Sequence, residues 1–365
     1  MKANMKTSES ETGVVTSVRA FRPPAAIRRR ESPAQLLNAL YILDEPSLPL
    51  VYGPEEQRDI ARLIKFCGPP QTANSIRRNL QLLADVEVII SGWHAPVMDE
   101  TFLTAAPKLR AVFYGAGTTR YFTTEAFWRR NIILTSSAAA NAVPTAEYTQ
   151  SVIVLSLKHF WRFAAHVKNN GAWDPTRHVP GCYRSTVGLI SLGMVARKTL
   201  ELLRPFDLHR LVSCPFLTEQ EAGQLKVERC KLSELFRRAD VVSLHTPDLP
   251  QTRGMITGEH FASMKLGATF INTARGAIVR ESEMAEVLRR RPDLTAVLDV
   301  THPEPPASNS PLLTLPNVVL TPHIAGSMGS EINRLGRCMV EELRRFVTGK
   351  PLKWQITQES AATLA

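Results

Sequence analysis

The stretch VGLISLGMVA, residues 187–196, decides the fold expected for this 365-residue chain. Its first half is apolar, as in a buried strand, and a glycine-containing turn and a helix start follow. The spacing matches the fingerprint G-x-G-x-x-G/A, with Ser191 in the first glycine position, Gly193 in the second and Ala196 in the third. Such a turn brings helix N-terminal amides close to a pyrophosphate. Taken alone, the stretch also fits a plain strand-to-helix turn.

Apolar runs alternate with helical stretches on both sides of this turn. Six strands are expected from this turn onward, beginning with the strand that leads into it: Val187–Ser191, Arg210–Ser213, Val241–Leu244, Ala268–Asn272, Thr295–Leu298 and Val318–Thr321. Before it we expect strands at 86–90 and 109–114, with a helix at 99–105 between them. Amphipathic helices are expected over 145–168 and 331–348. The rhythm predicts an α/β protein whose six-stranded part is a doubly wound dinucleotide-binding sheet.

The charge of the chain is unevenly distributed. The formal net charge is +10, but residues 1–31 alone carry seven basic and three acidic side chains. We therefore interpret residues 1–34 as a disordered basic arm, and the charge does not predict nucleic acid as a partner.

The cysteines and the apolar runs narrow the class of protein further. Five scattered cysteines without a C-x-x-C pair argue against a disulfide framework and against a metal site, and favour a reducing, cytoplasmic setting. No apolar run approaches the roughly 18 residues of a membrane span. The N-terminus also lacks the layout of a secretion signal, so we expect no membrane partner.

Three polar segments follow predicted strands: NTARG at 272–276, DVTHPEP at 299–305 and TPHIAG at 321–326. In doubly wound folds ligands bind outside the carboxyl ends of the strands, so these segments can converge on one cleft. A guanidinium binds a carboxylate through two hydrogen bonds, and a histidine oriented by a carboxylate exchanges protons near neutral pH. We therefore predict that Arg275, Glu304 and His323 are the catalytic residues.

From about residue 89 to residue 350 the chain resembles the D-isomer-specific 2-hydroxyacid dehydrogenases, the family of glyoxylate/hydroxypyruvate reductases and phosphoglycerate dehydrogenase. Besides the three segments above, the resemblance is carried by 106–109, Asn141, 146–147, 186–196, 240–247, Thr252 and 264–268. It implies a Rossmann-type dinucleotide-binding domain (141–323) inserted in a flavodoxin-like substrate domain (35–140 and 324–352), followed by a tail (353–365). It also implies a homodimer, with the helix over 145–168 in the interface.

The resemblance assigns roles to individual residues. Arg275 corresponds to the family's substrate-carboxylate arginine, His323 to its acid/base and Glu304 to the carboxylate paired with that histidine. The implied cofactor-binding residues are Leu192, Gly193, Met194, Val195, Cys214, His245, Thr246, Pro247, Thr252, Thr273, Ala274, Asp299 and His323. The implied substrate contacts are Ser91, Gly92, Ala116 and Gly117, together with Arg275.

Two departures from the family pattern bear on specificity. The second strand of the nucleotide fold usually ends on Asp or Glu, which bonds the ribose hydroxyls, but here it ends on Ser213-Cys214-Pro215. NAD and NADP therefore both remain open. The substrate loop usually reads G-x-G-x-D-N, whereas this chain has Gly115-Ala116-Gly117-Thr118-Thr119-Arg120. We expect Arg120 to alter substrate selectivity.

The function expected from the resemblance is the reduction of a small 2-oxo acid to a D-2-hydroxy acid, and the reverse, with NAD or NADP. One alternative is a dinucleotide-sensing, corepressor-like interaction module, which has the same fold but little turnover. A phosphite or formate dehydrogenase is another, although formate dehydrogenases pair the histidine with Gln rather than with a residue such as Glu304.

Overall fold

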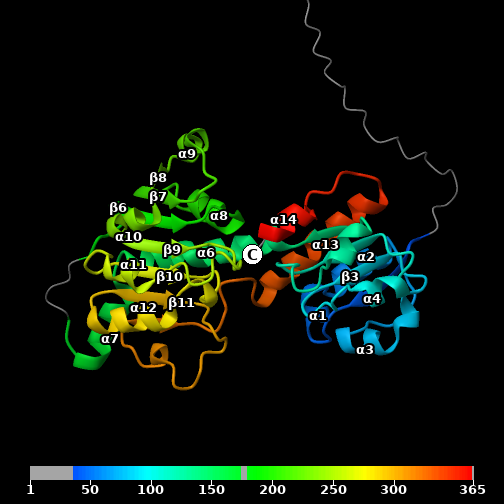
Figure 1. Ribbon diagram of the computed structural model, residues 1–365, viewed down its shortest axis with the longest axis horizontal. Coiled ribbons are helices and arrows are strands. Elements are labelled where there is room, and N and C mark those ends of the chain that lie inside the picture. Colours follow the sequence, from blue (N-terminus) through cyan, green and yellow to red (C-terminus); the bar gives the residue numbers. More distant parts are fainter. Residues whose placement is uncertain (1–35, 174–178, 364–365) are drawn as a thin grey trace, which may run out of the picture. The chain divides into compact units, whose positions relative to one another are not determined.

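The computed structural model describes residues 36–173 and 179–363 (Figure 1). The basic arm predicted at residues 1–34 lies outside the described residues. Within the described part, no helix is both long enough and apolar enough to cross a membrane.

The first sheet has six strands in the order β13-β5-β4-β3-β1-β2. Their bounds are β1 (Asn38–Ile42), β2 (Lys65–Phe66), β3 (Val88–Ser91), β4 (Ala111–Tyr114), β5 (Ile133–Ser136) and β13 (Gln355–Ile356). Five of them pair in parallel, and β13 pairs antiparallel with β5. The strands expected at 86–90 and 109–114 are β3 and β4. Part of the predicted tail belongs to this sheet, because Ile356 pairs with Leu134.

Alternating side chains of the first sheet pack into two separate cores. In β1, Ala39 and Tyr41 face one cluster, whereas Leu40 and Ile42 face the other. Helices therefore cover both faces, which explains why most residues of the parallel strands are apolar. The helices with this sheet are α1 (Ser47–Val51), α2 (Pro54–Ala61), α3 (Ala73–Arg78), η1 (Leu80–Leu83), α4 (Glu100–Ala105), α5 (Glu125–Arg129), α13 (Ile332–Val347) and α14 (Gln358–Thr363).

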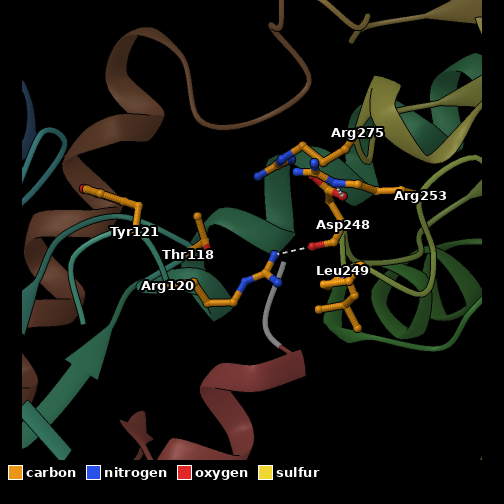
Figure 2. Close-up of a pocket in the computed structure, with 8 residues that line it drawn as sticks. Thr118, Arg120, Tyr121, Asp248, Leu249, Arg253 and Arg275 are labelled. Atoms are coloured by element: carbon orange, nitrogen blue, oxygen red, sulfur yellow. Dashed lines mark hydrogen bonds and ion pairs between the residues drawn. The ribbon is translucent and has the colours of Figure 1, made fainter. Parts of the chain in front are cut away.

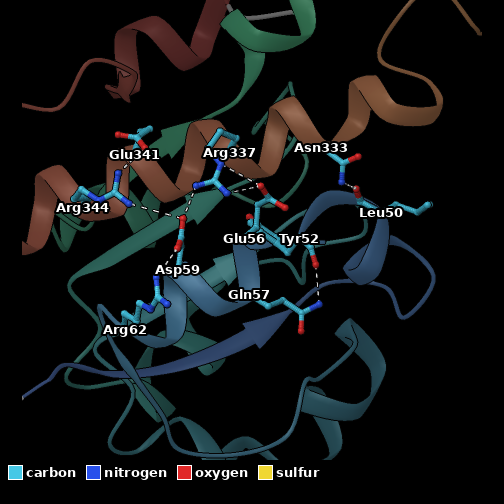
Figure 3. Close-up of polar contacts among 10 residues, drawn as sticks. All are labelled: Leu50, Tyr52, Glu56, Gln57, Asp59, Arg62, Asn333, Arg337, Glu341 and Arg344. Carbon is cyan, nitrogen blue, oxygen red and sulfur yellow. Dashed lines mark hydrogen bonds and ion pairs between the residues drawn. The ribbon is translucent and has the colours of Figure 1, made fainter. Parts of the chain in front are cut away.

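Helix α13 follows the second sheet in the sequence but belongs to the first sheet, where it packs against α1 and α2. Arg337 of α13 donates to the buried Glu56 at 2.7 Å and to Asp59 at 2.6 Å, both on α2 (Figure 3). The packing leaves no room beside Gly336, where a Cβ would lie 1.8 Å from the Val51 carbonyl oxygen. The polar contacts and this close approach fix the position of α13.

The second sheet has seven strands in the order β12-β11-β10-β9-β6-β7-β8, all paired in parallel. Their bounds are β6 (Tyr183–Ile190), β7 (Asp207–Ser213), β8 (Glu228–Arg229), β9 (Val241–Leu244), β10 (Thr269–Asn272), β11 (Thr295–Leu298) and β12 (Val318–Leu320). The six strands expected from the sequence are present, and the two-residue β8 adds an edge. The prediction of an α/β fold with parallel sheets is confirmed.

Helices cover both faces of this sheet as well. Val242 and Leu244 of β9 face a core shared with α10, α11 and α12, whereas Val241 faces a core shared with α6 and α8. The helical elements are α6 (Ala138–Ser156), α7 (Phe160–Asn170), α8 (Met194–Leu202), α9 (Glu219–Leu225), α10 (Leu232–Arg238), α11 (Gly258–Ala262), η2 (Gly276–Ile278), α12 (Glu281–Arg290), η3 (Pro311–Leu313) and η4 (Gly329–Glu331).

The single helix predicted over 145–168 is wrong in its extent. The structure has two helices, because His159 adopts φ +50°, a left-handed conformation that cannot continue a right-handed helix. Helix α6 also begins earlier than predicted, at Ala138, and contains Pro144. Neither Gly nor Pro marks the break, and the apolar period runs through it, so the pattern gave no signal.

Replacing Gly336 with Ala should destabilise the fold by more than about 3 kcal/mol, because the new methyl group collides with backbone rather than with a movable side chain. Urea unfolding of the purified chain measures this loss. Gly223 in α9 is the matched control, since a Cβ there meets nothing within 4 Å. Gly223→Ala should stabilise the chain by about 0.5–1 kcal/mol. Equal unfolding midpoints for the two variants would contradict the close packing of α13.

Candidate active site

The candidate site lies at the carboxyl edge of the second sheet. Strands β9, β10, β11 and β12 are parallel neighbours, so the residues after each strand emerge at the same edge. Arg275 follows β10, Glu304 follows β11 and His323 follows β12. The topology therefore gathers three segments that are far apart in the sequence.

Glu304 and His323 form a hydrogen-bonded pair. The distance from Nδ1 of His323 to Oε1 of Glu304 is 2.5 Å, and the two side chains are 47% and 40% exposed. A carboxylate on Nδ1 fixes the orientation of the ring and leaves Nε2 for another partner. The exposure means that a small molecule can reach the ring.

The backbone of His323 is held by a buried carboxylate. Asp299 Oδ1 accepts from the Thr321 hydroxyl at 2.6 Å and from the Ile324 amide at 2.8 Å, and Oδ2 accepts from the Ala325 amide at 2.8 Å. His323 itself has φ +55°, a conformation that costs a residue with a side chain roughly 1–2 kcal/mol. The Asp299 bonds hold the segment in this conformation. They leave one acceptor position on Oδ2 of Asp299, which the family resemblance includes among the cofactor-binding residues.

Arg275 is positioned by the side chain of Asn272, the last residue of β10. Asn272 accepts from the Ala274 amide at 2.9 Å and donates to the Arg275 carbonyl at 3.1 Å. The guanidinium donates to the Ala274 carbonyl at 2.6 Å. Burial lowers the pKa of Arg275, while the nearby Glu304 carboxylate acts in the opposite direction. The group still keeps its positive charge at neutral pH, close enough to Glu304 to interact with it.

A glycine lets the arginine segment lie against the glutamate segment. A Cβ on Gly276 would stand 2.1 Å from the backbone carbon of Thr301. The next residue, His302, donates its amide to the Glu281 carboxyl at 2.7 Å. Burial raises the pKa of Glu281 to about 7. The two segments are therefore in direct backbone contact, and any larger residue at position 276 would separate Arg275 from Glu304.

A cavity of 710 Å³ adjoins Arg275 (Figure 2). Its lining consists of Thr118, Arg120, Tyr121, Asp248, Leu249, Pro250, Arg253 and Arg275. The residues 118–121 follow β4 of the first sheet, and 248–253 follow β9 of the second. Sequence reasoning named Arg275 and Arg120 but missed Asp248 and Arg253. Their position after the predicted strand 241–244 was the available signal.

The predicted substrate contacts in the first sheet are only partly placed near this cavity. Ser91 is fully buried, and its hydroxyl donates to the Ile42 carbonyl at 2.6 Å, so its side chain serves the sheet. Gly92 and Ala116 are also buried, and the Ala116 carbonyl accepts from Ser137. Gly117 is half-buried, has open space beside its Cα, and immediately precedes Thr118 of the cavity.

The turn after β6 has the geometry of a dinucleotide site. Ser191 adopts φ +74°, the left-handed conformation for which the fingerprint normally uses glycine. Gly193 caps helix α8 without a side-chain hydrogen bond, and a Cβ there would meet nothing within 4 Å. Leu192 is buried, whereas Met194 is 39% exposed. The first amides of α8 are thus accessible to a phosphate group.

The other predicted cofactor residues lie at the same edge. Cys214 follows β7 and is half-buried. His245 and Thr246 are buried after β9, and the Thr246 hydroxyl has no hydrogen-bond partner within the described structure. Thr252 accepts from the Leu249 amide at 2.8 Å and donates to the Pro247 carbonyl at 2.6 Å, which closes the 247–252 loop. Thr273 contacts Thr149 of α6. An unpartnered hydroxyl and an open helix N-terminus both fit a dinucleotide.

Comparison with known proteins places the chain in a family. Residues 151–325 match the model of the D-isomer specific 2-hydroxyacid dehydrogenase NAD binding domain. An (S)-sulfolactate dehydrogenase from Chromohalobacter salexigens is 33% identical over 252 residues, which cover 68% of this chain and 81% of that protein. The chain belongs to the D-isomer specific 2-hydroxyacid dehydrogenase family, as the sequence motifs predicted.

Other relatives extend the comparison. D-3-phosphoglycerate dehydrogenase from Methanocaldococcus jannaschii is 27% identical over 80% of this chain, but the match spans only 56% of that protein. The chain thus spans about half the length of such relatives. The crystal structure of D-mandelate dehydrogenase from Rhodotorula graminis shares the fold, with a TM-score of 0.74 at 21% identity over 88% of this chain and 98% of that one.

His245 should make the stability of the chain depend on pH. Burial lowers its pKa from 6.5 to about 4, so the unfolded chain takes up a proton in this window and the folded chain does not. The stability contributed by neutral His245 is complete above pH 6.5 and is lost as the pH falls to about 4, by roughly 3 kcal/mol. Urea unfolding of the wild type and of His245→Gln between pH 4 and 8 isolates this contribution, because Glu281 titrates in both proteins. A pH-independent difference between their unfolding free energies would contradict the assignment.

Proposed function

We propose that the chain reduces a small 2-oxo acid to the D-2-hydroxy acid, and catalyses the reverse reaction, with a nicotinamide dinucleotide. The observation that carries this proposal is the Glu304–His323 pair at the edge where Arg275 borders the cavity. Family membership supports the same reaction class. The domain bounds 35–140 with 324–352, and 141–323, are part of this proposal, as is the homodimer.

The cofactor is proposed to lie along the carboxyl edge of the second sheet. The amides of residues 192–195 would bind its pyrophosphate, and residues 245–247 with Thr252 would line the adenosine end. Thr273, Ala274 and Asp299 would contact the nicotinamide end. When bound, the dinucleotide supplies the hydride that reduces the substrate carbonyl carbon, or accepts it in the reverse direction.

Arg275 would hold the substrate carboxylate. Its guanidinium donates one hydrogen bond to the Ala274 carbonyl, and its remaining donors suit the two oxygens of a carboxylate. Burial strengthens such a charged pair, because the surroundings screen it less than water does. The backbone at Gly117 and Thr118 lies on the other side of the substrate in this proposal, which orients the carbonyl group toward His323.

His323 would donate a proton from Nε2 to the carbonyl oxygen during reduction and remove it during oxidation. Glu304 would keep the ring oriented through Nδ1 and balance the positive charge of the imidazolium form. His245 is unsuited to this task, since burial holds its pKa at about 4 and it is neutral at physiological pH. Among the histidines that follow strands of this sheet, His323 has the exposure and the carboxylate partner that an acid/base needs.

Replacing His323 with Ala should reduce turnover by about 10²–10⁴-fold while dinucleotide binding persists, because only the proton transfer is lost. The measurement is NADH and NADPH oxidation with glyoxylate, hydroxypyruvate and larger 2-oxo acids, alongside titration of dinucleotide fluorescence. His209→Ala, at an exposed residue of β7, is the matched control and should keep wild-type turnover. Wild-type turnover in the His323 variant would refute the acid/base role, and no turnover in the wild type despite cofactor binding would favour a sensing module.

With Cys214 at the end of β7, the chain should bind both NADH and NADPH. No carboxylate at this position bonds the ribose hydroxyls or repels a 2′-phosphate. Cys214→Asp should shift the preference toward NADH by about tenfold or more, since a hydrogen bond to a charged group contributes about 1.5–3 kcal/mol. The readout is the ratio of the Kd values for NADH and NADPH. Cys67→Asp, after β2 of the first sheet, should leave that ratio unchanged. An unchanged ratio in Cys214→Asp would remove Cys214 from the ribose site.

A further inference from the structure

We propose that the substrate is a 2-oxo acid carrying a second anionic group, and that Arg120 binds that group in the cavity beside Arg275. The inference rests on the proposed function and specifies its substrate class. It starts from the charges of the cavity wall, which contains three arginines and one aspartate.

The single carboxylate of the cavity is already paired. Asp248 accepts from Arg253 Nε at 2.8 Å and from Arg253 Nη2 at 3.1 Å, a two-point contact that satisfies both partners. The pKa of Asp248 is lowered by this contact, so it is ionised at neutral pH. The charges of Asp248 and Arg253 cancel, and the wall keeps the two positive charges of Arg120 and Arg275.

These two arginines have no carboxylate within ion-pair distance in the part of the chain that the structure describes. Arg120 Nη2 donates to the backbone carbonyl of Asp248 at 2.6 Å, and Arg120 Nε is buried without a hydrogen-bond partner. A guanidinium has five N–H donors, so most of those on Arg120 are unused. Leaving a buried donor unpaired is unfavourable, and an anionic ligand would remove that cost.

The two arginines also approach the cavity from different elements. Arg120 comes from the loop after β4, whereas Arg275 comes from the segment after β10 (Figure 2). Their charges repel, since Arg120 contributes to lowering the pKa of Arg275. A ligand with an anionic group at each end would neutralise both. With Arg275 on the 2-oxo carboxylate, Arg120 is left for a second carboxylate, sulfonate or phosphate.

The size of the cavity fits such a ligand. At 710 Å³ it lies within the usual range for small-molecule sites, roughly 300–1,000 Å³, so it has room for an acid with a second anionic group. An uncharged substrate chain would leave the Arg120 donors without a partner. Sites built to hydrogen-bond a substrate group discriminate strongly against analogues that lack it.

The test uses the full chain with two substrates of equal carbon number, oxaloacetate and 2-oxobutanoate, which differ in a terminal carboxylate or methyl group. We expect kcat/KM to be about tenfold or more higher for oxaloacetate, because a charged hydrogen bond is gained. 3-Sulfopyruvate and phosphohydroxypyruvate show which anionic group is preferred. Arg120→Gln should bring the oxaloacetate-to-oxobutanoate ratio close to one, and Arg120→Lys should keep part of it. Arg62→Gln, at the end of α2 where the side chain is 77% exposed, should keep the wild-type ratio.

The outcomes separate this inference from the proposed function. If the wild type reduces both acids equally well, the second-anion site is refuted and the proposed reaction stands; an unchanged ratio in Arg120→Gln refutes the role of Arg120. If the wild type reduces none of the acids, the proposed reaction fails. Calorimetric titration with D-malate and D-2-hydroxybutanoate then tests the second-anion site through binding alone. Equal affinities for the two acids would overturn that site. The wild-type ratio needs no variant, so a folding defect in a mutant cannot hide the answer.

Discussion

A buried carboxylate at the end of β11 organises the candidate site. Asp299 accepts three hydrogen bonds from residues 321–325. Because Asp299 is buried, the loss of one of these bonds would destabilise the fold by roughly 1–3 kcal/mol. These bonds hold His323 in a left-handed backbone conformation that its own preferences disfavour. The ring is then placed where Glu304 can bond its Nδ1. The proton chemistry proposed for His323 therefore depends on a side chain that need not touch the substrate carbonyl at all.

Parallel pairing supplies the rest of the arrangement. Because neighbouring strands β9 to β12 run in the same direction, every segment that follows them emerges at one edge. Two close approaches then set the spacing between those segments. Gly276 allows backbone contact with Thr301, and the Asn272 side chain holds the Ala274 amide and the Arg275 carbonyl. Hydride transfer and proton transfer require the reacting groups to be held within about 0.5 Å of their productive positions. Rigid strand ends provide this precision better than free loops.

The strands were the most predictable part of the fold. Buried parallel strands are continuous apolar runs, and six such runs between 187 and 321 became β6, β7, β9, β10, β11 and β12. The extent of the helix over 145–168 was mispredicted because the left-handed residue at the break is a histidine, and no Gly or Pro marks that position in the sequence. The strand in the tail was also not predicted. Ile356 pairs with the edge strand β5, and no local sequence pattern indicates this pairing.

The sequence by itself determined the chemical types and the family: a guanidinium, an imidazole and a carboxylate after successive strands, within motifs of the D-isomer specific 2-hydroxyacid dehydrogenases. It also marked Ser191 as a departure, although the backbone there still adopts the conformation of glycine. Only the tertiary structure decided that Ser91 serves the sheet, and that Asp248 neutralises Arg253 while Arg120 has no ion-pair partner among the described residues. The physical reason is distance. Local patterns report on neighbours along the chain, whereas the charge of a cavity depends on residues 128 positions apart, such as Arg120 and Asp248, that meet only after folding.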